Sequence, residues 1–260
     1  KYLQKRFPAG LFLFLYGGYS ACDPDGVEIL SQTNASGYIV VGEGEKKLEL
    51  LLRQCLHAPE NSKMEFRPEV NGVIKPKEHL TPFDIPRSYF ATQFPNLDFL
   101  PIPDYDEFFD SYKRATRQNP FLLLSRMQPI LLVEGTRGCF AHCDFCAQNA
   151  QWQGFRKLAP DAVFERTLKL ASKYNCRGVQ FVDNVCDTWA ERYADLMRDS
   201  KVKVESFMEL RAHHKDRFWA KLYLGGVTHV QVRVEALSPP LLGKIGKGTR
   251  VVQNLVAQKC

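Results

Sequence analysis

Three cysteines lie close together in the sequence: Cys139, Cys143 and Cys146 fall within eight positions. Clustered thiols of this kind bind metal in a reducing compartment, where disulfides are rare. Zinc in a closed structural site takes four ligands, usually as two short pairs. None of the candidates for a fourth ligand has zinc-finger spacing; they are His142, Cys176 and Cys186. An iron–sulfur cluster is the alternative, because three thiolates on four irons leave one iron open to an outside ligand.

The other cysteines are scattered along the chain, and a lone cysteine usually serves as a small buried hydrophobe. We expect this role for Cys22, Cys55, Cys176, Cys186 and Cys260. Metal chemistry is therefore expected in the 139–146 loop.

The composition is that of an ordinary globular protein, with 45% hydrophobic and 25% charged residues among 260. The net charge of +6 is mildly basic and is not gathered into a tail, so we expect no nucleic-acid partner. The strongest apolar run, residues 11–16, is shorter than the ~20 residues needed to cross a bilayer. We expect no membrane span, no signal peptide and a cytoplasmic location.

The first part of the chain, residues 1–58, alternates strands with helices. Apolar strands at 11–18 and 37–45 alternate with helical stretches at 23–33 and 45–57, which predicts the parallel sheet of a doubly wound α/β domain. Glycines follow the carboxyl ends of both strands, where such sheets bind ligands; they are Gly17, Gly18, Gly42 and Gly44. The alternative is that each glycine only makes a tight turn.

Residues 59–127 are rich in proline and read as a connector between two domains. A small hairpin is predicted around Asn71–Gly72. The stretch 96–115 reads as an extended linker leading into an amphipathic helix, apolar enough to pack on another element.

From residue 128 to 260 the alternation of strands and helices returns and predicts four βα units, part of a βα barrel. The expected helices are 160–174, 187–199, 214–224 and one last helix, with strands near 130, 178, 202 and 227. Four units are too few to close a barrel, and the chain begins without Met, so we expect a fragment of a longer protein. The cysteine loop directly follows the first strand, at the face where barrel active sites assemble.

The pattern Cys139-x3-Cys143-x2-Cys146, with Phe145 before the last cysteine, resembles the signature of the radical S-adenosylmethionine (SAM) superfamily. The resemblance implies a 4Fe-4S cluster held by the three cysteines, with the amino and carboxylate groups of SAM on the fourth iron. It also implies reductive cleavage of SAM to a 5′-deoxyadenosyl radical that abstracts hydrogen from unactivated carbons.

The same resemblance suggests further SAM-binding residues at strand ends. Asp183 and Asn184 end the second strand where the family places polar groups for the SAM amino group, although Asp-Asn is also an ordinary turn pair. Glu209 and Arg211 end the third strand and are candidates for SAM or substrate, or for a surface ion pair.

After the fourth strand, residues 232–248 resemble the G-x-E-S segment of the family, which makes Glu235 and Ser238 candidate SAM contacts. Arg233 or Val234 stands where the family has glycine, so two registers are open. The adjacent histidines at 213 and 214 begin a helix and are interpreted as solvent or capping groups.

The N-terminal part and its connector resemble those of cobalamin-dependent radical SAM enzymes. By this resemblance Gly17 and Gly18 lie beside the nucleotide tail of the corrinoid, and Gly42 and Gly44 form the closing turn. An Asp-x-His-x-x-Gly motif, frequent upstream in such domains, is not in this chain, and the lower ligand of cobalt is not assigned. The expected fold is thus a partial Rossmann-like cobalamin-binding domain followed by a partial radical SAM barrel.

Within that group the cysteine loop, "VQFVDNVCD" and "EALSPPLLGKIGKG" are most similar to enzymes that methylate carbons of ribosomally synthesised peptides (RiPP maturation). The implied cofactors are a 4Fe-4S cluster, SAM and cobalamin; the implied partners are a peptide or small-molecule substrate and an electron donor such as flavodoxin or ferredoxin. Cyclisation, rearrangement or sulfur insertion with the same cofactors is the second hypothesis. A zinc-stabilised binding module without catalysis is the third. No catalytic side chain is assigned.

Overall fold

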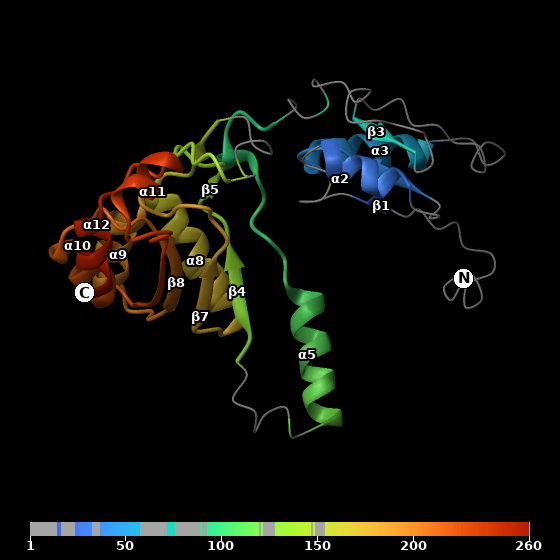
Figure 1. Cartoon of the computed structure of the whole chain (residues 1–260). Coiled ribbons are helices and arrows are strands. Elements are labelled where there is room, and N and C mark those ends of the chain that lie inside the picture. The colour runs from blue at the N-terminus through green and yellow to red at the C-terminus, as the bar shows by residue number, and fades with distance from the viewer. Residues whose placement is uncertain are drawn as a thin grey trace. The chain divides into compact units, whose positions relative to one another are not determined.

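The computed structural model describes residues 15–16, 24–32, 37–57, 72–75, 89, 93–119, 121, 128–146, 148 and 154–259 (Figure 1). The chain divides into two compact units. The first is Lys1–Phe94 with Ala150–Gln153, and the second is Pro95–Asn149 with Gly154–Cys260. The division falls inside the stretch that the sequence predicts to be a connector.

The first unit holds a three-stranded sheet and two helices. The elements in chain order are β1 (Leu15–Tyr16), α2 (Pro24–Ser31), β2 (Tyr38–Val40), α3 (Glu45–His57) and β3 (Val73–Ile74). Strands β1 and β2 pair in parallel, as predicted for a doubly wound sheet, and β3 pairs with β2 in the antiparallel sense. The core of this unit is formed by Val27, Ile39, Val41 and Ile74. Strand β3 follows Gly72, but its partner is β2, and the residues before Gly72 that the predicted hairpin needs lie outside the described residues.

The second unit contains a four-stranded parallel sheet in the order β4-β7-β8-β9. Its strands are β4 (Ile130–Val133), β7 (Gly178–Phe181), β8 (Glu205–Leu210) and β9 (Val227–Val232). The helices that follow them are α8 (Pro160–Tyr174), α9 (Ala190–Asp199), α10 (Asp216–Leu224), α11 (Pro239–Lys244) and α12 (Val251–Lys259). A two-stranded antiparallel ribbon, β5 (Thr136–Arg137) and β6 (Arg156–Lys157), lies in the first βα connection. The four predicted βα units are confirmed.

Two helices stand where one last helix is predicted. Gly246 and Gly248, between α11 and α12, have φ angles of 62° and 68°. This left-handed backbone is open to glycine at little cost and cannot continue an α-helix. The glycines therefore end α11 and set Lys247 in a turn of its own.

Alternating burial along the strands separates the two faces of the sheet. Met208 and Leu210 on β8 are fully buried, whereas Ile130 and Leu132 on β4 are exposed. Side chains of a strand alternate between the faces, so one face packs on helices and the other is open in the described part of the chain. The helices α8, α9 and α10 follow one another along the packed face (Figure 1).

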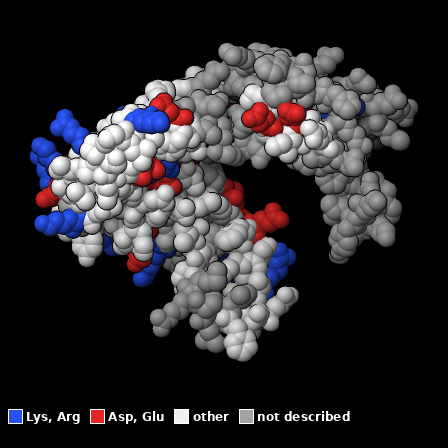
Figure 2. Space-filling model, in the orientation of Figure 1, with Lys and Arg blue, Asp and Glu red and all other residues white. Residues whose placement is uncertain are grey.

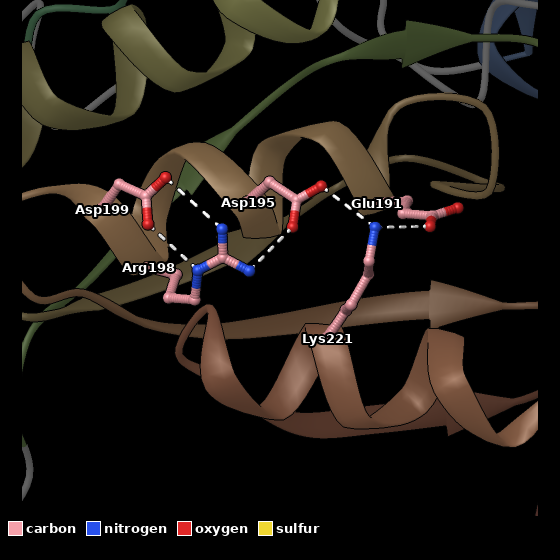
Figure 3. A network of polar contacts seen from close by, with 5 residues as sticks. All are labelled: Glu191, Asp195, Arg198, Asp199 and Lys221. Atoms are coloured by element: carbon pink, nitrogen blue, oxygen red, sulfur yellow. Dashed lines mark hydrogen bonds and ion pairs between the residues drawn. The ribbon is translucent and has the colours of Figure 1, made fainter.

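Helices α9 and α10 are joined by charged side chains and by a close backbone approach. Lys221 on α10 donates to Glu191 and Asp195 on α9 at 2.8 and 3.1 Å (Figure 3). At the end of α10, a Cβ added to Gly225 would lie 2.6 Å from the Cα and carbonyl oxygen of Ala194. Glycine at 225 is therefore required for the two helices to pack at this distance.

The segment before the sheet is attached to α8. A 3-10 turn, η3 (Leu97–Phe99), precedes α5 (Asp106–Gln118), and Arg166 of α8 donates to the carbonyl oxygens of residues 98 and 100 at 3.3 and 3.0 Å. Phe109 of α5 stacks on Tyr174 with ring centroids 4.6 Å apart. The expectation that this apolar stretch packs on another element is confirmed for α8.

Charged residues on the face shown in Figure 2 are mixed in sign, with Lys and Arg among Asp and Glu. This distribution agrees with the modest net charge of the whole chain. Within the part of the chain that the structure describes, no helix is long and apolar enough to cross a membrane.

Candidate functional site

The cysteine loop starts just beyond the carboxyl end of β4 and is held by its own backbone. The Cys146 N–H donates to the Cys143 carbonyl oxygen at 3.0 Å, and the Ala141 N–H donates to Sγ of Cys139 at 3.4 Å. Cys143 is 8% exposed, the other two cysteines are half-buried, and all three are free thiols. The loop thus presents three unpaired sulfurs at the carboxyl edge of the parallel sheet.

The spacing of these sulfurs discriminates between metals. Ligands of one tetrahedral zinc with Zn–S bonds of 2.3 Å lie about 3.8 Å apart. The three sulfurs of the loop, all in described residues, do not all lie within 4.8 Å of one another. A cluster of several irons spans a wider set of thiolates than a single ion does, so the trio fits a cluster better than zinc.

Two cations lie near the most buried thiol. Burial raises the pKa of Cys143 above its ordinary value, and the positive charges of Lys247 and Arg211 act against this rise. Thiolates are the metal-binding form of cysteine. The two cations therefore favour the form of Cys143 that binds metal.

The turn between α11 and α12 packs on the cysteine loop. The Asp144 N–H donates to the Ile245 carbonyl oxygen at 3.1 Å, and Arg211 donates to the Lys247 carbonyl oxygen at 2.6 Å. The buried Lys247 ammonium donates to Glu235 at 2.9 Å. Glu235 has a φ of 61°, which is uncommon outside glycine and costs backbone strain of about 1–3 kcal/mol. The ion pair therefore holds Glu235 in a strained position beside the cysteine loop.

Asp183 is buried and hydrogen-bonded at the ends of β4 and β7. It is 2% exposed, and its two carboxylate oxygens accept hydrogen bonds from the Gly135 N–H at 2.7 Å and from Nε1 of Trp189 at 2.9 Å. Burial raises the pKa of Asp183 to about 7, although these bonds and those of Thr136 act to lower it. The carboxylate thus joins the ends of β4 and β7 to the start of α9.

Asn184, the second residue of that predicted pair, does reach the cysteine loop. Its Nδ2 donates to Oε1 of Gln148 at 3.0 Å, two positions beyond Cys146. The side chain is half-buried, so it keeps an open side. Of the pair, Asn184 is the better placed for a ligand at the loop.

The other predicted site residues have separate partners. Glu209 forms an ion pair with Arg233, just after β9. The alternative of a surface ion pair between Glu209 and Arg211 is therefore wrong. Arg211 lies over the ring of Phe140 in the cysteine loop, 5.9 Å from its centroid. Ser238 is exposed and stands at the N-cap of α11 without a side-chain capping bond. The structure therefore brings Arg211 to the cysteine loop, connects Glu235 to this loop through Lys247, and pairs Glu209 with Arg233.

Comparison with known proteins bears directly on this unit. Residues 133–255 match the family model described as the radical SAM superfamily, which spans the cysteine loop, Arg211 and Lys247. This part of the chain is similar to radical SAM domains. An uncharacterized methyltransferase of Pyrococcus horikoshii is 26% identical over 170 residues, which is 63% of this chain and 35% of that protein. The chain thus spans about a third of that relative.

Solved structures extend the likeness beyond the radical SAM domain. The cobalamin-dependent S-adenosylmethionine radical enzyme OxsB, with aqua-cobalamin bound, gives a TM-score of 0.61 at 18% identity and covers 98% of this chain and 36% of its own. The radical S-adenosylmethionine methyltransferase TsrM from Kitasatospora setae, with cobalamin and a [4Fe-4S] cluster bound, gives 0.60 at 16% identity, covering 94% and 47%. At these identities the likeness concerns the fold, and it includes both units of the chain.

A radical SAM domain implies a 4Fe-4S cluster and SAM. The residues present fit the cluster, since three free thiols lie in one loop without being gathered within 4.8 Å of one another, and two cations lie near the most buried sulfur. Phe145 is 55% exposed at the rim of the loop and forms no part of the core. It stays a candidate contact for SAM.

The glycines of the first unit are only partly described. Gly42, with a φ of 74°, and Gly44 form the turn from β2 into α3. Below this turn the buried Lys47 donates to the carbonyl oxygens of Val41 and of Tyr89, the latter at 2.6 Å. Gly17 and Gly18 lie outside the described residues. Of the glycines predicted to line the ligand-binding edge of this sheet, the structure therefore describes only those in the 42–44 turn.

Sequence reasoning missed Lys247, Gln148 and the role of Arg233 at this site. A lysine between glycines in "GKIGKG" is a signal for Lys247, but Lys244 in the same stretch is exposed and equally plausible from sequence. Among the lone cysteines, Cys176 and Cys186 are buried as predicted. The side chain of Cys55 and all of Cys22 and Cys260 lie outside the described residues.

Proposed function

We propose that the chain belongs to a cobalamin-dependent radical SAM enzyme that methylates an unactivated carbon, in a ribosomally synthesised peptide. The observation that carries the proposal is the set of three free thiols at the carboxyl end of β4, which are not all gathered within 4.8 Å of one another and are flanked by Lys247 and Arg211. The fold of both units, which resembles cobalamin-binding radical SAM enzymes, supports the choice of subclass.

Cys139, Cys143 and Cys146 would hold the 4Fe-4S cluster and leave one iron for SAM. When bound, cluster and SAM supply a 5′-deoxyadenosyl radical that abstracts hydrogen from carbon. Toward these groups the chain offers the cation of Arg211, the exposed ring of Phe145 and the amide of Asn184. Lys247 is engaged with Glu235, so its part is to set the charge beside Cys143 and to hold the 245–248 turn against the loop.

For cobalamin we propose residues 1–58, as the C-terminal part of a Rossmann-like domain, with Gly17, Gly18, Gly42 and Gly44 beside the corrinoid. The parallel pairing of β1 with β2 and the bare turn at Gly42 support this proposal. Residues 59–127 are then the connector and residues 128–260 the radical SAM domain. Glu209 and Ser238 stay candidate contacts for SAM or substrate. Asp183 supports the site indirectly, through its hydrogen bonds with Gly135 and Trp189.

The proposed substrate is a peptide, and the proposed reductant is a flavodoxin or ferredoxin. An enzyme with an oxygen-sensitive cluster and free thiols suits the reducing cytoplasm, which we propose as its location. The resemblance of the cysteine loop and of the 235–248 stretch to peptide-maturing methyltransferases supports the peptide class.

Methyl transfer can be tested with SAM that carries a deuterated methyl group. The cluster-loaded protein, supplied with cobalamin and reductant, is incubated with peptide substrates encoded beside its gene. Mass spectrometry is expected to find labelled methyl on peptide carbon together with 5′-deoxyadenosine. Formation of 5′-deoxyadenosine with a rearranged or cyclised peptide and no labelled methyl would reject methylation and favour the second hypothesis.

A further inference from the structure

A second cluster of potential metal ligands lies outside the cysteine loop. Asp187, in the connection after β7, and His213 and His214, in the connection after β8, bring three ligand atoms within 4.8 Å of one another. Among the residues that the structure describes, no other group of three His, Cys, Asp or Glu side chains has its ligand atoms this close together. Sequence reasoning took both histidines for solvent or capping groups.

The three side chains are held in place from several directions. Nε2 of His214 contacts Oδ1 of Asp187, and Nδ1 of His213 lies 3.8 Å from the same oxygen. The backbone N–H of Arg211 donates to both carboxylate oxygens of Asp187 at 3.3 and 3.4 Å. The ring of His214 stacks on Phe218 with centroids 3.6 Å apart. Such supporting contacts orient first ligands at metal sites and limit the rearrangement that binding requires.

An open cavity borders both histidines. A cavity of about 560 Å³ is lined by both histidines, by the start of α10 at residues 215–217 and by α12 at Val252, Gln253 and Val256. Asp187 is 5% exposed and His214 14%, whereas His213 is 40% exposed. Because Nε2 of His214 and Oδ1 of Asp187 are in direct hydrogen-bond contact, they must separate by roughly 1 Å to bind one zinc ion with bonds of 2.0–2.1 Å, and His213, the more exposed of the three, must move toward them.

We propose that Asp187, His213 and His214 form a zinc site with three protein ligands and a fourth coordination position for water or a substrate atom. Two imidazoles and one carboxylate suit zinc, whereas Mg²⁺ and Ca²⁺ prefer oxygen ligands alone. Three protein ligands with one open position are the arrangement of zinc sites that bind water or a substrate atom. The site is separate from the cysteine loop, so it does not depend on the proposed function.

The site also connects to the radical SAM domain's cysteine loop through Arg211. The same residue whose N–H holds Asp187 directs its guanidinium to Lys247 and to the ring of Phe140. Zinc bound at Asp187 would therefore hold Arg211, just after β8, in the position where it contacts the cysteine loop.

Zinc binding can be separated from the cysteines by spectroscopy. The cluster-loaded protein is stripped with a chelator that leaves iron and sulfide unchanged, then titrated with Co²⁺ and, in competition, with Zn²⁺. We expect one Co²⁺ per chain with d–d bands and without the thiolate charge-transfer band that a cysteine site produces, and full displacement by zinc. His213→Ala is expected to weaken binding at least about a hundredfold, with iron content unchanged.

His229→Ala, an exposed histidine on β9, is the matched control and should bind as the wild type does. Asp187→Asn is a second variant, which is needed because a water molecule could replace the missing imidazole in His213→Ala. Circular dichroism checks the fold of each variant. The proposal is overturned if the wild type takes up no Co²⁺ at micromolar concentration, or if His213→Ala and Asp187→Asn both bind it as tightly as the control.

Discussion

The ammonium of Lys247 lies 2.9 Å from a carboxylate oxygen of Glu235, with the lysine side chain 4% exposed. This pair joins the segment after β9 to the turn between α11 and α12, and its cation acts on Cys143 in the cysteine loop. A buried positive charge near a cluster favours the reduced cluster, which carries one more electron.

Lys247→Met is expected to lower the reduction potential of the cluster by on the order of tens of millivolts, because it removes this charge and keeps a side chain of similar length. Potentiometric titration followed by EPR measures the shift. Lys244→Met removes an exposed lysine of the same stretch and is the control. Equal potentials in the two variants would show that Lys247 has no electrostatic part at the site.

Gly225→Ala is expected to lower the free energy of unfolding by about 3 kcal/mol, because the new Cβ would overlap the backbone of Ala194 and separate α9 from α10. Urea denaturation followed by circular dichroism measures it. Gly243→Ala is the matched change in α11, where a Cβ meets nothing within 4 Å, and should stabilise by up to about 1 kcal/mol. Equal effects of the two substitutions would contradict the close packing.

Asp183 is expected to make stability depend on pH. Its pKa is raised from 3.8 to about 7 in the fold, so the folded protein binds more protons than the unfolded chain between these values. The free energy of unfolding should therefore fall as the pH rises from 4 to 7, by about 2–4 kcal/mol, and then level off.

Asp183→Asn should flatten this pH dependence, since the amide does not titrate, at the cost of one hydrogen bond from Gly135 or Trp189. Asp98→Asn, at the exposed η3 turn, should retain the wild-type slope. Urea midpoints measured across this pH range test the prediction, and parallel profiles for wild type and Asp183→Asn would assign the slope to other groups.

Cys143→Ala is expected to abolish both the cluster and SAM cleavage while corrinoid binding by the first unit persists. Iron, labile sulfide, 5′-deoxyadenosine and the corrinoid absorbance give the readouts. Cys176→Ala, a buried thiol away from the loop, should keep its cluster. SAM cleavage retained in Cys143→Ala would refute the ligand assignment.

The fold was largely predictable because its signals are local. Apolar strands and amphipathic helices alternate along residues 128–260, and α8 begins and ends at the predicted residues 160 and 174. The division of the last helix was missed, since it depends on the left-handed backbone at Gly246 and Gly248. The antiparallel pairing of β3 was missed because strand partners are set by tertiary packing.

The site residues that are defined by their spacing in the sequence could be predicted. Those that are defined by hydrogen-bond partners from other segments could not. The three cysteines follow from their positions in one loop. Asp183 was predicted to face SAM, but Trp189, six residues later, turns back on it and shares its carboxylate with Gly135. The partnership of Lys247 with Glu235 joins residues in separate segments, and no periodic pattern announces it.

The central claim is that three thiols hold a cluster with one open iron. An anaerobic EPR spectrum of the iron- and sulfide-reconstituted, reduced protein, recorded without and with SAM, tests it most directly. We predict a reduced-cluster signal that shifts when SAM is added. A protein that binds zinc at these cysteines and gives no cluster signal would contradict the account.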